Sequence, residues 1–294
     1  MIHREYLDYY ITYHCNLKCA NCSVGSPYID PTFQWDFDSF KNDIDNLSKY
    51  MRINKLRLIG GEPTLHPDIA EFMKYASESD LVLHGVAVAT NGISLKSMSS
   101  EFWKYCQMAH ISEYANTTIN YDKIYKWLDD NNKPYKKVHE LLRNSDFKDR
   151  CIEKHGKEWM DGVTPDLGTF RDLVVREELD HDKAQEVYSA CNMKDICHTF
   201  NNGKYYNCGF SIHRNFYYDS IGVKIPYDLN ETDGIKIDDD DFEQNYHDLI
   251  NSKEININAC RWCKGFGENT SVKSENLPHR QLTVDEIQAV KIYH

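Results

Sequence analysis

The chain has 294 residues, which is long enough for one large hydrophobic core with a small appended module. A net charge of −12 and a pI near 5.5 argue against a surface that binds nucleic acid or an anionic membrane. Because the first residues, MIHREY, contain no apolar signal region and no apolar run approaches a membrane span, we expect a cytoplasmic protein with no membrane partner. There, its ten cysteines are expected to bind metal rather than to form disulfides.

Strands and helices are predicted to alternate through the first half of the chain. The expected strands lie at residues 9–14, 55–59, 86–89 and 109–114, and the expected helices at 37–51, 67–76, 95–105 and 121–129. This alternation is typical of a parallel sheet with helices outside it. If the sheet curves, the fold is an α/β partial (β/α)6 barrel of the TIM type, with its active site at the carboxyl ends of the strands.

The second half of the chain has a different composition. Between residues 131 and 190 we place at most two further strand–helix pairs, and from Cys191 to Cys263 the chain holds five of its ten cysteines. We therefore expect a barrel at residues 1–190 and a small cysteine-rich α+β module at 191–294, closed by a helix at 283–292. The run Asp238–Asp241 is interpreted as the solvated first turn of a helix rather than a cation site, because acidic residues are favoured at helix N-termini.

Three cysteines follow the first predicted strand at the spacing C-x3-C-x2-C, namely Cys15, Cys19 and Cys22. Iron–sulfur clusters require thiolates at such short spacings, and three ligands leave one iron of a four-iron cluster open. Zinc usually takes four protein ligands and would be poorly satisfied by three cysteines. The alternative is that these are three ordinary thiols in a loop.

The cysteine loop resembles that of the radical S-adenosylmethionine (SAM) enzymes. Two further motifs fit the family in order, each after a predicted strand: Gly60–Pro63 resembles its GGEP motif, and Ala89–Gly92 (ATNG) follows the third strand. The resemblance is good over roughly residues 8–120. One departure is Asn21, because the residue before the third cysteine is commonly aromatic in the family and lies against the adenine.

The resemblance implies a [4Fe–4S] cluster on the three cysteines, with SAM bound at the open iron. An electron from a low-potential donor such as flavodoxin or ferredoxin would then cleave SAM to a 5′-deoxyadenosyl radical, which abstracts a hydrogen atom from the substrate. The two glycines would let the backbone approach the cofactor closely. The residues expected at the cofactor are Asn21, Gly60, Gly61, Glu62, Pro63, Thr90, Asn91 and Ser112. For Thr90 and Asn91, the alternative is an ordinary Asn-Gly turn. For Ser112, the alternative is a hydroxyl group that hydrogen-bonds to the backbone.

A second set of cysteines comprises Cys191, Cys197, Cys208, Cys260 and Cys263. The set resembles the C-terminal twitch and SPASM modules that hold auxiliary [4Fe–4S] clusters. The single-cluster twitch type fits better, because a two-cluster SPASM module needs more cysteines. Four ligands would leave one spare, either Cys191 or Cys197. Zinc is the alternative, because Cys260-x2-Cys263 is also half of a zinc knuckle. The segment Gly203–Cys208 is expected to form a β-turn and a strand.

No residue is identified as catalytic from the sequence. Cys106 is interpreted as a packed hydrophobe on a helical stripe. Cys151 is a weak candidate for returning a hydrogen atom to a substrate radical, as thiols do in some epimerases of the superfamily. Arg171 is a weak candidate for taking a substrate proton.

The layout resembles 2-deoxy-scyllo-inosamine dehydrogenases and radical SAM proteins of surface-polysaccharide clusters. We therefore expect an oxidoreductase that oxidises or epimerises a small polar metabolite such as a sugar, cyclitol or sugar nucleotide. Oxidation is favoured because a second cluster can accept an electron. A ribosomal-peptide maturase is an alternative, although only fourteen residues precede Cys15 and the peptide-recognition domain of many maturases is not expected. A non-catalytic metal-binding scaffold is a third possibility.

Overall fold

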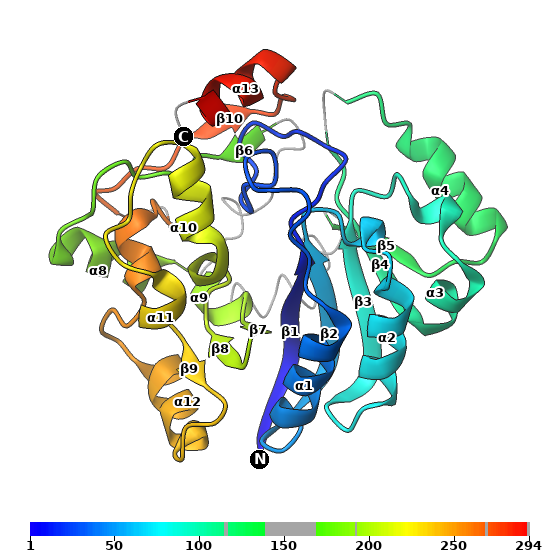
Figure 1. Cartoon of the computed structure of the whole chain (residues 1–294), viewed down its shortest axis with the longest axis horizontal. Coiled ribbons are helices and arrows are strands. Elements are labelled where there is room, and N and C mark those ends of the chain that lie inside the picture. The colour runs from blue at the N-terminus through cyan, green and yellow to red at the C-terminus, as the bar shows by residue number, and fades with distance from the viewer. Residues whose placement is uncertain (115–116, 139–168, 192, 268–269, 293–294) are drawn as a thin grey trace.

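An eight-stranded sheet runs through the computed structural model, which describes residues 1–114, 117–138, 169–191, 193–267 and 270–292 (Figure 1). The strand order is β5-β4-β3-β2-β1-β7-β8-β9. The parallel strands are β1 (Ile2–Thr12), β2 (Met51–Gly60), β3 (Val82–Thr90), β4 (Cys106–Ile111), β5 (Tyr135–Lys137) and β7 (Thr199–Asn201). The antiparallel strands are β8 (Lys204–Tyr206) and β9 (Ile235–Lys236). The predicted mixed α/β fold with a largely parallel sheet is confirmed.

The helices that connect the parallel strands pack on one face of the sheet. They are α1 (Phe37–Leu47), α2 (Ile69–Glu78), α3 (Ser100–Tyr105) and α4 (Tyr121–Asp130), with short 3-10 helices η1 (Pro63–Leu65) and η2 (Leu95–Ser97). Phe40 of α1 and Phe72 of α2 are fully buried, with ring centroids 4.5 Å apart. Burial of such aromatic side chains is the main stabilising contribution of these helices.

Several predicted elements differ from the structure in their bounds, among them α1, β1 and β4. The predicted helix extends to Met51, because that residue continues the apolar spacing. In the structure, α1 ends at Leu47 and Met51 is the first residue of β2. Strand β1 begins at Ile2 rather than at residue 9. Cys106 is buried as expected, but it is the first residue of β4 and not part of a helical stripe.

The C-terminal half lies on the other side of β1 from α1–α4 (Figure 1). Its helices are α8 (His181–Ala190), α9 (Met193–Ile196), α10 (Phe210–Ser220), α11 (Leu229–Thr232), α12 (Phe242–Asn251), η3 (Asn258–Trp262) and α13 (Val284–Ile292). A separate two-stranded sheet pairs β6 (Thr169–Arg171) with β10 (Asn276–Pro278). The run Asp238–Asp241 is expected to form the first turn of a helix, but it lies in the turn that directly precedes α12. None of the described helices is long and apolar enough to cross a membrane.

The cysteine-rich half is joined to the barrel sheet through the edge of β1. Asn201 of β7 binds the backbone of Tyr10 twice, accepting from its N–H at 3.1 Å and donating to its carbonyl at 2.9 Å. Asp43 of α1 adds a second link, because it accepts from the Tyr9 hydroxyl at 2.7 Å and from the Gly203 N–H at 2.8 Å. An open strand edge would leave backbone groups unpaired, and β7 covers this one. Residues on both sides of position 190 therefore share one sheet.

The turn between β7 and β8 has the geometry that the sequence predicts. Asn202 and Gly203 have φ values of 53° and 71°. Positive φ at both central residues is the signature of a two-residue hairpin turn, for which Asn-Gly is the preferred pair. The hairpin carries the chain to Cys208, two residues beyond β8.

Candidate active site

The loop after β1 brings Cys15, Cys19 and Cys22 together, so that each thiol acts electrostatically on the other two. Burial raises the pKa of Cys15 to about 12 and that of Cys19 to about 11. A buried thiol keeps its proton unless a positive charge or a metal stabilises the thiolate. Three thiols on one tight loop, two of them with raised pKa values, therefore fit a metal cluster. The Cys22 N–H donates to the Cys19 carbonyl at 3.2 Å and closes the turn.

The double glycine at the end of β2 lies directly against this loop. The Gly61 N–H donates to the Thr12 carbonyl at 2.8 Å, and the Glu62 N–H donates to the His14 carbonyl at 2.7 Å. Gly60 has a φ of 145°, and a Cβ there would lie 2.0 Å from the Thr12 oxygen. A Cβ on Gly61 would lie 2.4 Å from the His14 oxygen. Both glycines are thus required because the backbone at the end of β1 passes so close to them. From the sequence alone, only the approach of the cofactor explains them.

Glu62 joins the ends of β2 and β3. Its Oε1 accepts from the Thr64 N–H at 3.2 Å and from the hydroxyls of Thr64 and Thr90 at 2.5 and 2.6 Å. Its Oε2 accepts from the Asn91 N–H at 2.7 Å. The side chain is fully buried, and Pro63 begins η1 beside it. Both carboxylate oxygens are therefore used within the protein.

Asn91 extends the same network to the cysteine loop. Its Nδ2 donates to Asn16 Oδ1 at 2.7 Å, and its Oδ1 accepts from the Ile93 N–H at 3.0 Å. Asn16 lies between two of the loop cysteines, and no sequence motif singles it out. At the end of β4, the Ser112 N–H donates to the Thr90 carbonyl at 2.9 Å. The predicted motifs thus meet at the carboxyl ends of β1 to β4, with Asn21 half-buried in the loop.

A C-terminal segment covers the loop, which the sequence did not reveal. The Ala20 N–H donates to the Arg280 carbonyl at 3.0 Å. Gln281 Nε2 donates to Cys19 Sγ at 3.4 Å, and His279 Nε2 lies 3.5 Å from the same sulfur. An isolated His and Gln, 260 and 262 residues away from Cys19, carry no pattern that would predict these contacts.

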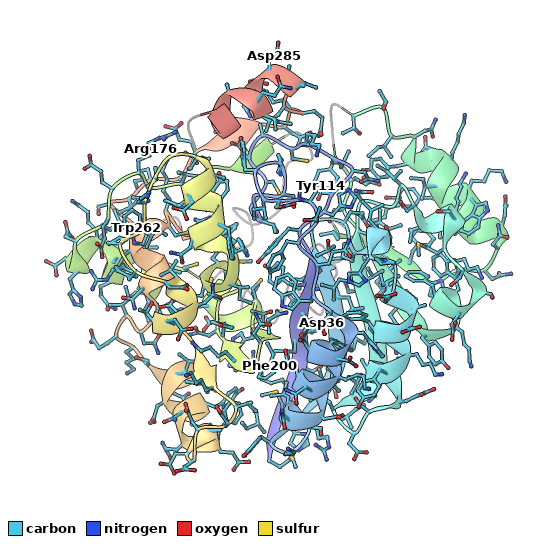
Figure 2. All side chains as sticks on the ribbon, in the orientation of Figure 1. Asp36, Tyr114, Arg176, Phe200, Trp262 and Asp285 are labelled. Atoms are coloured by element: carbon cyan, nitrogen blue, oxygen red, sulfur yellow. The ribbon has the colours of Figure 1, made fainter. Side chains whose placement is uncertain are left out.

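Tyr114, labelled in Figure 2, lies just beyond β4 on the same side of the sheet. Its ring centroid is 5.5 Å from that of His279. Burial and then the neighbouring thiols of Cys19, Cys22 and Cys15 raise its pKa well above the usual range. An aromatic ring therefore lies near the cysteine loop, although Asn21 does not supply one.

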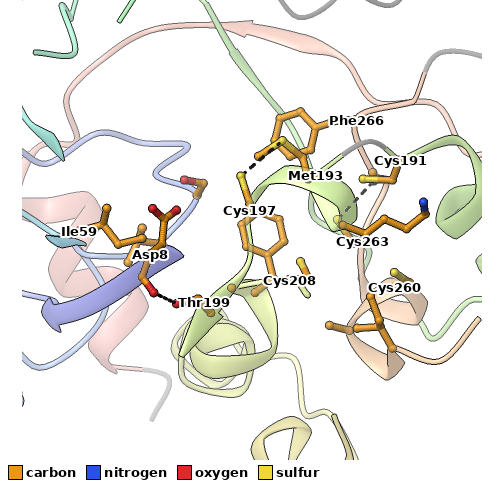
Figure 3. Close-up of a pocket in the computed structure, with 18 of the residues that line it drawn as sticks. Asp8, Ile59, Cys191, Met193, Cys197, Thr199, Cys208, Cys260, Cys263 and Phe266 are labelled. Carbon is orange, nitrogen blue, oxygen red and sulfur yellow. Dashed lines mark hydrogen bonds between the residues drawn. The ribbon is translucent and has the colours of Figure 1, made fainter. Parts of the chain in front are cut away.

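All five cysteines of the second set line one cavity of about 230 Å³ (Figure 3). Four of them act on one another electrostatically in every pairing: Cys191, Cys208, Cys260 and Cys263. Cys197 differs, since it interacts with Cys191 and Cys208 but also with Asp8 and Arg57 of the sheet. Its Sγ lies 3.9 Å from the Met193 sulfur. In Figure 3, Cys197 lies between Asp8 and the other cysteines.

A buried guanidinium stands beside this second set. Arg214 is 1% exposed, donates from Nη2 to the Leu173 carbonyl at 3.1 Å, and has no hydrogen-bond partner for Nε. No carboxylate of the described residues pairs with it. Cys263 and Cys208 are close enough to act on its charge. Arg214 does not itself line the cavity, and its guanidinium carbon lies 4.4, 5.8 and 5.2 Å from the ring centroids of Phe210, Tyr217 and Tyr218. These rings stabilise the buried cation, and a negatively charged group in the neighbouring cavity would stabilise it further.

The cavity also reaches the inner face of the barrel sheet. Asp8, Arg57 and Gly60 line it together with the cysteines. Arg57 donates to both oxygens of Asp8, each at 2.8 Å. Within the described part of the chain, no three His, Cys, Asp or Glu side chains are grouped closely enough to hold a single metal ion.

The two weak catalytic candidates from the sequence are Cys151 and Arg171. Cys151 lies outside the described residues. Arg171 ends β6, which pairs with β10 and not with the eight-stranded sheet.

Residues 9–154 match the family model of the radical SAM superfamily. A 7,8-dihydro-6-hydroxymethylpterin dimethyltransferase of Methanocaldococcus jannaschii is 33% identical over 90 residues, which are 30% of this chain and 17% of the relative. Mycofactocin maturase MftC of Mycobacterium tuberculosis is 35% identical over 89 residues, 30% of this chain and 22% of the relative. The matched region thus spans only 17% and 22% of these relatives. The crystal structure of BtrN in complex with AdoMet and 2-DOIA aligns with a TM-score of 0.47 and 14% identity, over 92% of this chain and 98% of BtrN.

Proposed function

Since residues 9–154 form a radical SAM superfamily domain, we propose that the chain is an oxidoreductase that removes a hydrogen atom from a small polar metabolite and completes its oxidation with the help of a second cluster. A domain of this superfamily implies a [4Fe–4S] cluster and SAM. Enzymes that carry it act on small substrates or peptides and need a reductant. The nature of the substrate and the second cluster are the proposal.

Cys15, Cys19 and Cys22 are proposed to hold the first cluster. Their loop is held from three directions: by Gly61 and Glu62 at the end of β2, by Asn91 at the end of β3, and by the segment around Gln281. The Thr90 hydroxyl donates to Glu62, and the Asn91 side chain donates to Asn16 in the loop. Because these side chains are used within the protein, we assign Glu62, Thr90 and Asn91 to positioning the loop. The backbone around Gly60–Pro63 and Ser112, and the exposed part of Asn21, remain available to SAM.

Tyr114 is proposed to take the place of the aromatic residue that the loop lacks. Adenine stacks well on aromatic rings, and the resemblance would put that ring next to the third cysteine, where Asn21 stands. Tyr114 reaches the same three thiols from the end of β4.

Cys191, Cys208, Cys260 and Cys263 are the proposed ligands of a second [4Fe–4S] cluster, with Cys197 as the spare thiol. Their mutual proximity in every pairing supports this choice. The buried, unpaired Arg214 supports a group of negative charge, which four thiolates around a four-iron cluster would provide. Zinc on four thiolates would also be negative, so metal analysis must decide between them.

The observation that carries oxidation is the shared cavity. It extends from Gly60, beside the first cysteine loop, past Asp8 and Arg57 to the second cysteine set. When bound, the cofactors supply an organic radical at one end of this space and an electron acceptor at the other. A substrate that loses a hydrogen atom, one further electron and a proton has undergone a two-electron oxidation.

The proposal is tested with anaerobically reconstituted protein, SAM, dithionite and candidate sugars or cyclitols, with 5′-deoxyadenosine and product followed by mass spectrometry. Wild type should bind about eight irons, and a Cys15/Cys19/Cys22→Ala variant about four, at four irons per cluster. Cys208→Ala should lose the second cluster and slow product formation, yet still form 5′-deoxyadenosine. Cys197→Ser, its matched control, should keep about eight irons. Four irons and one zinc in the wild type would remove the second cluster from the mechanism.

Peptide maturation is the second candidate, and the match to MftC over 89 residues is the observation in its favour. The same assay separates the two. Formation of 5′-deoxyadenosine that is stimulated by a short peptide, and not by sugars or cyclitols, would favour this candidate.

A further inference from the structure

The inner face of the barrel sheet carries an unusual set of side chains. Leu56 and Leu58 of β2 are fully buried, so alternation along the strand places Lys55 and Arg57 on the opposite face. Across the sheet, His110 of β4 is in register with Ala89 of β3 and Lys136 of β5. Lys55 is in register with Gly85 of β3 and Arg57 with Ala87, so β3 contributes no side chain larger than a methyl group between β2 and β4 on this face. The long side chains of Lys55 and Arg57 therefore approach His110 diagonally across β3.

Positive charges converge on His110 from both sides. Arg57, Lys55 and Lys136 all act on its ring electrostatically. The side chain is 4% exposed, and its Nδ1 has no hydrogen-bond partner. Burial, and then these three cations, lower the pKa of His110 to about 3, so the ring is neutral at pH 7. A buried ring nitrogen without a protein partner is available to form a hydrogen bond with a ligand.

Among the described residues, the positive charges on this face are not balanced by ion pairs of Lys55 or Lys136. The chain as a whole carries 46 acidic and 34 basic residues, so an uncompensated positive region is unexpected. Asp8 is paired with Arg57 through both of its oxygens. Lys55 and Lys136 form no ion pair or side-chain hydrogen bond in the described part of the chain. Lys136 is exposed and Lys55 half-buried, so both ammonium groups can be reached.

We propose that Lys55, Lys136 and His110 bind an anionic group of the substrate, a phosphate or a carboxylate, on the inner face of the sheet. This inference rests on the proposed function, because it names the substrate class of the same barrel. His110 lies two residues before Ser112 at the end of β4, so the anion would be held just below the cofactor-binding ends of the strands. Arg57, already held by Asp8, would add positive potential rather than a direct contact. The neutral part of the substrate would then point towards the first cysteine loop.

The test is calorimetric titration of the anaerobic, reconstituted full chain with glucose 1-phosphate, glucuronate and glucose. Either anion should bind at least about tenfold more tightly than glucose, the effect expected from one charge-assisted hydrogen bond. Added salt should weaken that preference, because the lysines are accessible to solvent. Tighter binding of glucose 1-phosphate would identify a phosphate substrate, and tighter binding of glucuronate a carboxylate one.

Three variants locate the site. Lys55→Gln and Lys136→Gln should each weaken anion binding about tenfold and leave glucose binding unchanged. Lys74→Gln, on the exposed surface of α2, is the matched control and should change nothing. Equal affinity for anions and glucose, binding of neither anion, or full anion affinity in both lysine variants would overturn the inference.

The same samples distinguish this failure from failure of the proposed function. Formation of 5′-deoxyadenosine without substrate should persist in both lysine variants. SAM cleavage with no anion preference overturns the anion site alone. Absence of SAM cleavage in the wild type, with a clear anion preference, overturns the radical chemistry and leaves the binding site standing.

Discussion

Glu62→Gln tests whether one buried carboxylate holds the carboxyl ends of β2 and β3 together. In the structure, Glu62 accepts four hydrogen bonds, three at Oε1 and one at Oε2 from the Asn91 N–H. An amide keeps one carbonyl oxygen, and its NH2 group would face the Asn91 N–H. Leaving that buried donor unpaired costs about 1–3 kcal/mol, and the remaining bonds lose their charge assistance. We expect a total loss of about 3 kcal/mol in the free energy of unfolding.

For a chain of this length, 3 kcal/mol corresponds to a decrease of about 5 °C in Tm. The assay is anaerobic thermal unfolding, followed by SAM titration of the reconstituted protein. SAM affinity should fall as well, because movement of Asn91 releases Asn16 and the cysteine loop. Glu71→Gln makes the same chemical change at an exposed site in the first turn of α2, and should stay within about 0.5 kcal/mol of wild type.

The reasoning is refuted if Glu62→Gln unfolds at the wild-type temperature and binds SAM normally. Burial raises the pKa of Glu62, while the four donors lower it. An unchanged Tm would mean that the folded chain holds Glu62 in its neutral form, which an amide imitates. The carboxylate would then not be the group that joins the two strands.

Three further predictions concern single side chains. Burial raises the pKa of Asp43 to about 6, compared with about 3.9 in the unfolded chain. Because the folded state therefore holds this proton up to a higher pH, the free energy of unfolding should fall by about 3 kcal/mol as the pH rises from about 4 to about 6. Urea unfolding of the apo chain should show this decrease in wild type and lack it in Asp43→Asn. Tyr114→Ala should weaken SAM binding about tenfold while Tyr114→Phe does not, and equal affinities would rule out stacking. Gln281→Ala should lower the reduction potential of the first cluster, measured by spectroelectrochemistry, because Cys19 loses a hydrogen bond; an unchanged potential would contradict this.

The strands and their terminal motifs could be predicted because each motif directly follows an apolar strand. Gly60 and Thr90 stand where β2 and β3 end, so the local pattern contains the information. The start of β1 could not be predicted in this way. His3, Arg4 and Glu5 break the apolar pattern of a strand that is held by its pairing to β2.

Long-range contacts of the site are absent from any local pattern. Asn16 and Gln281 act through single hydrogen bonds to partners far away in the chain. The proposed spare thiol shows the same limit, since spacing alone left Cys191 and Cys197 equivalent. Only the short helix α9 separates Cys191 from Cys197. Their surroundings differ because the chain turns at this helix, which places Cys197 beside Asp8.

The cover that Arg280 and Gln281 form over the cysteine loop has a consequence for biosynthesis. Cys19 leaves the ribosome 262 residues before Gln281 does. The loop is therefore complete, and the sheet around it largely synthesised, while nothing yet closes over it. Iron–sulfur delivery to the nascent or newly released chain meets an open loop, whereas delivery to the mature chain must first displace the segment. Repair of a damaged cluster would then be slower than its first assembly.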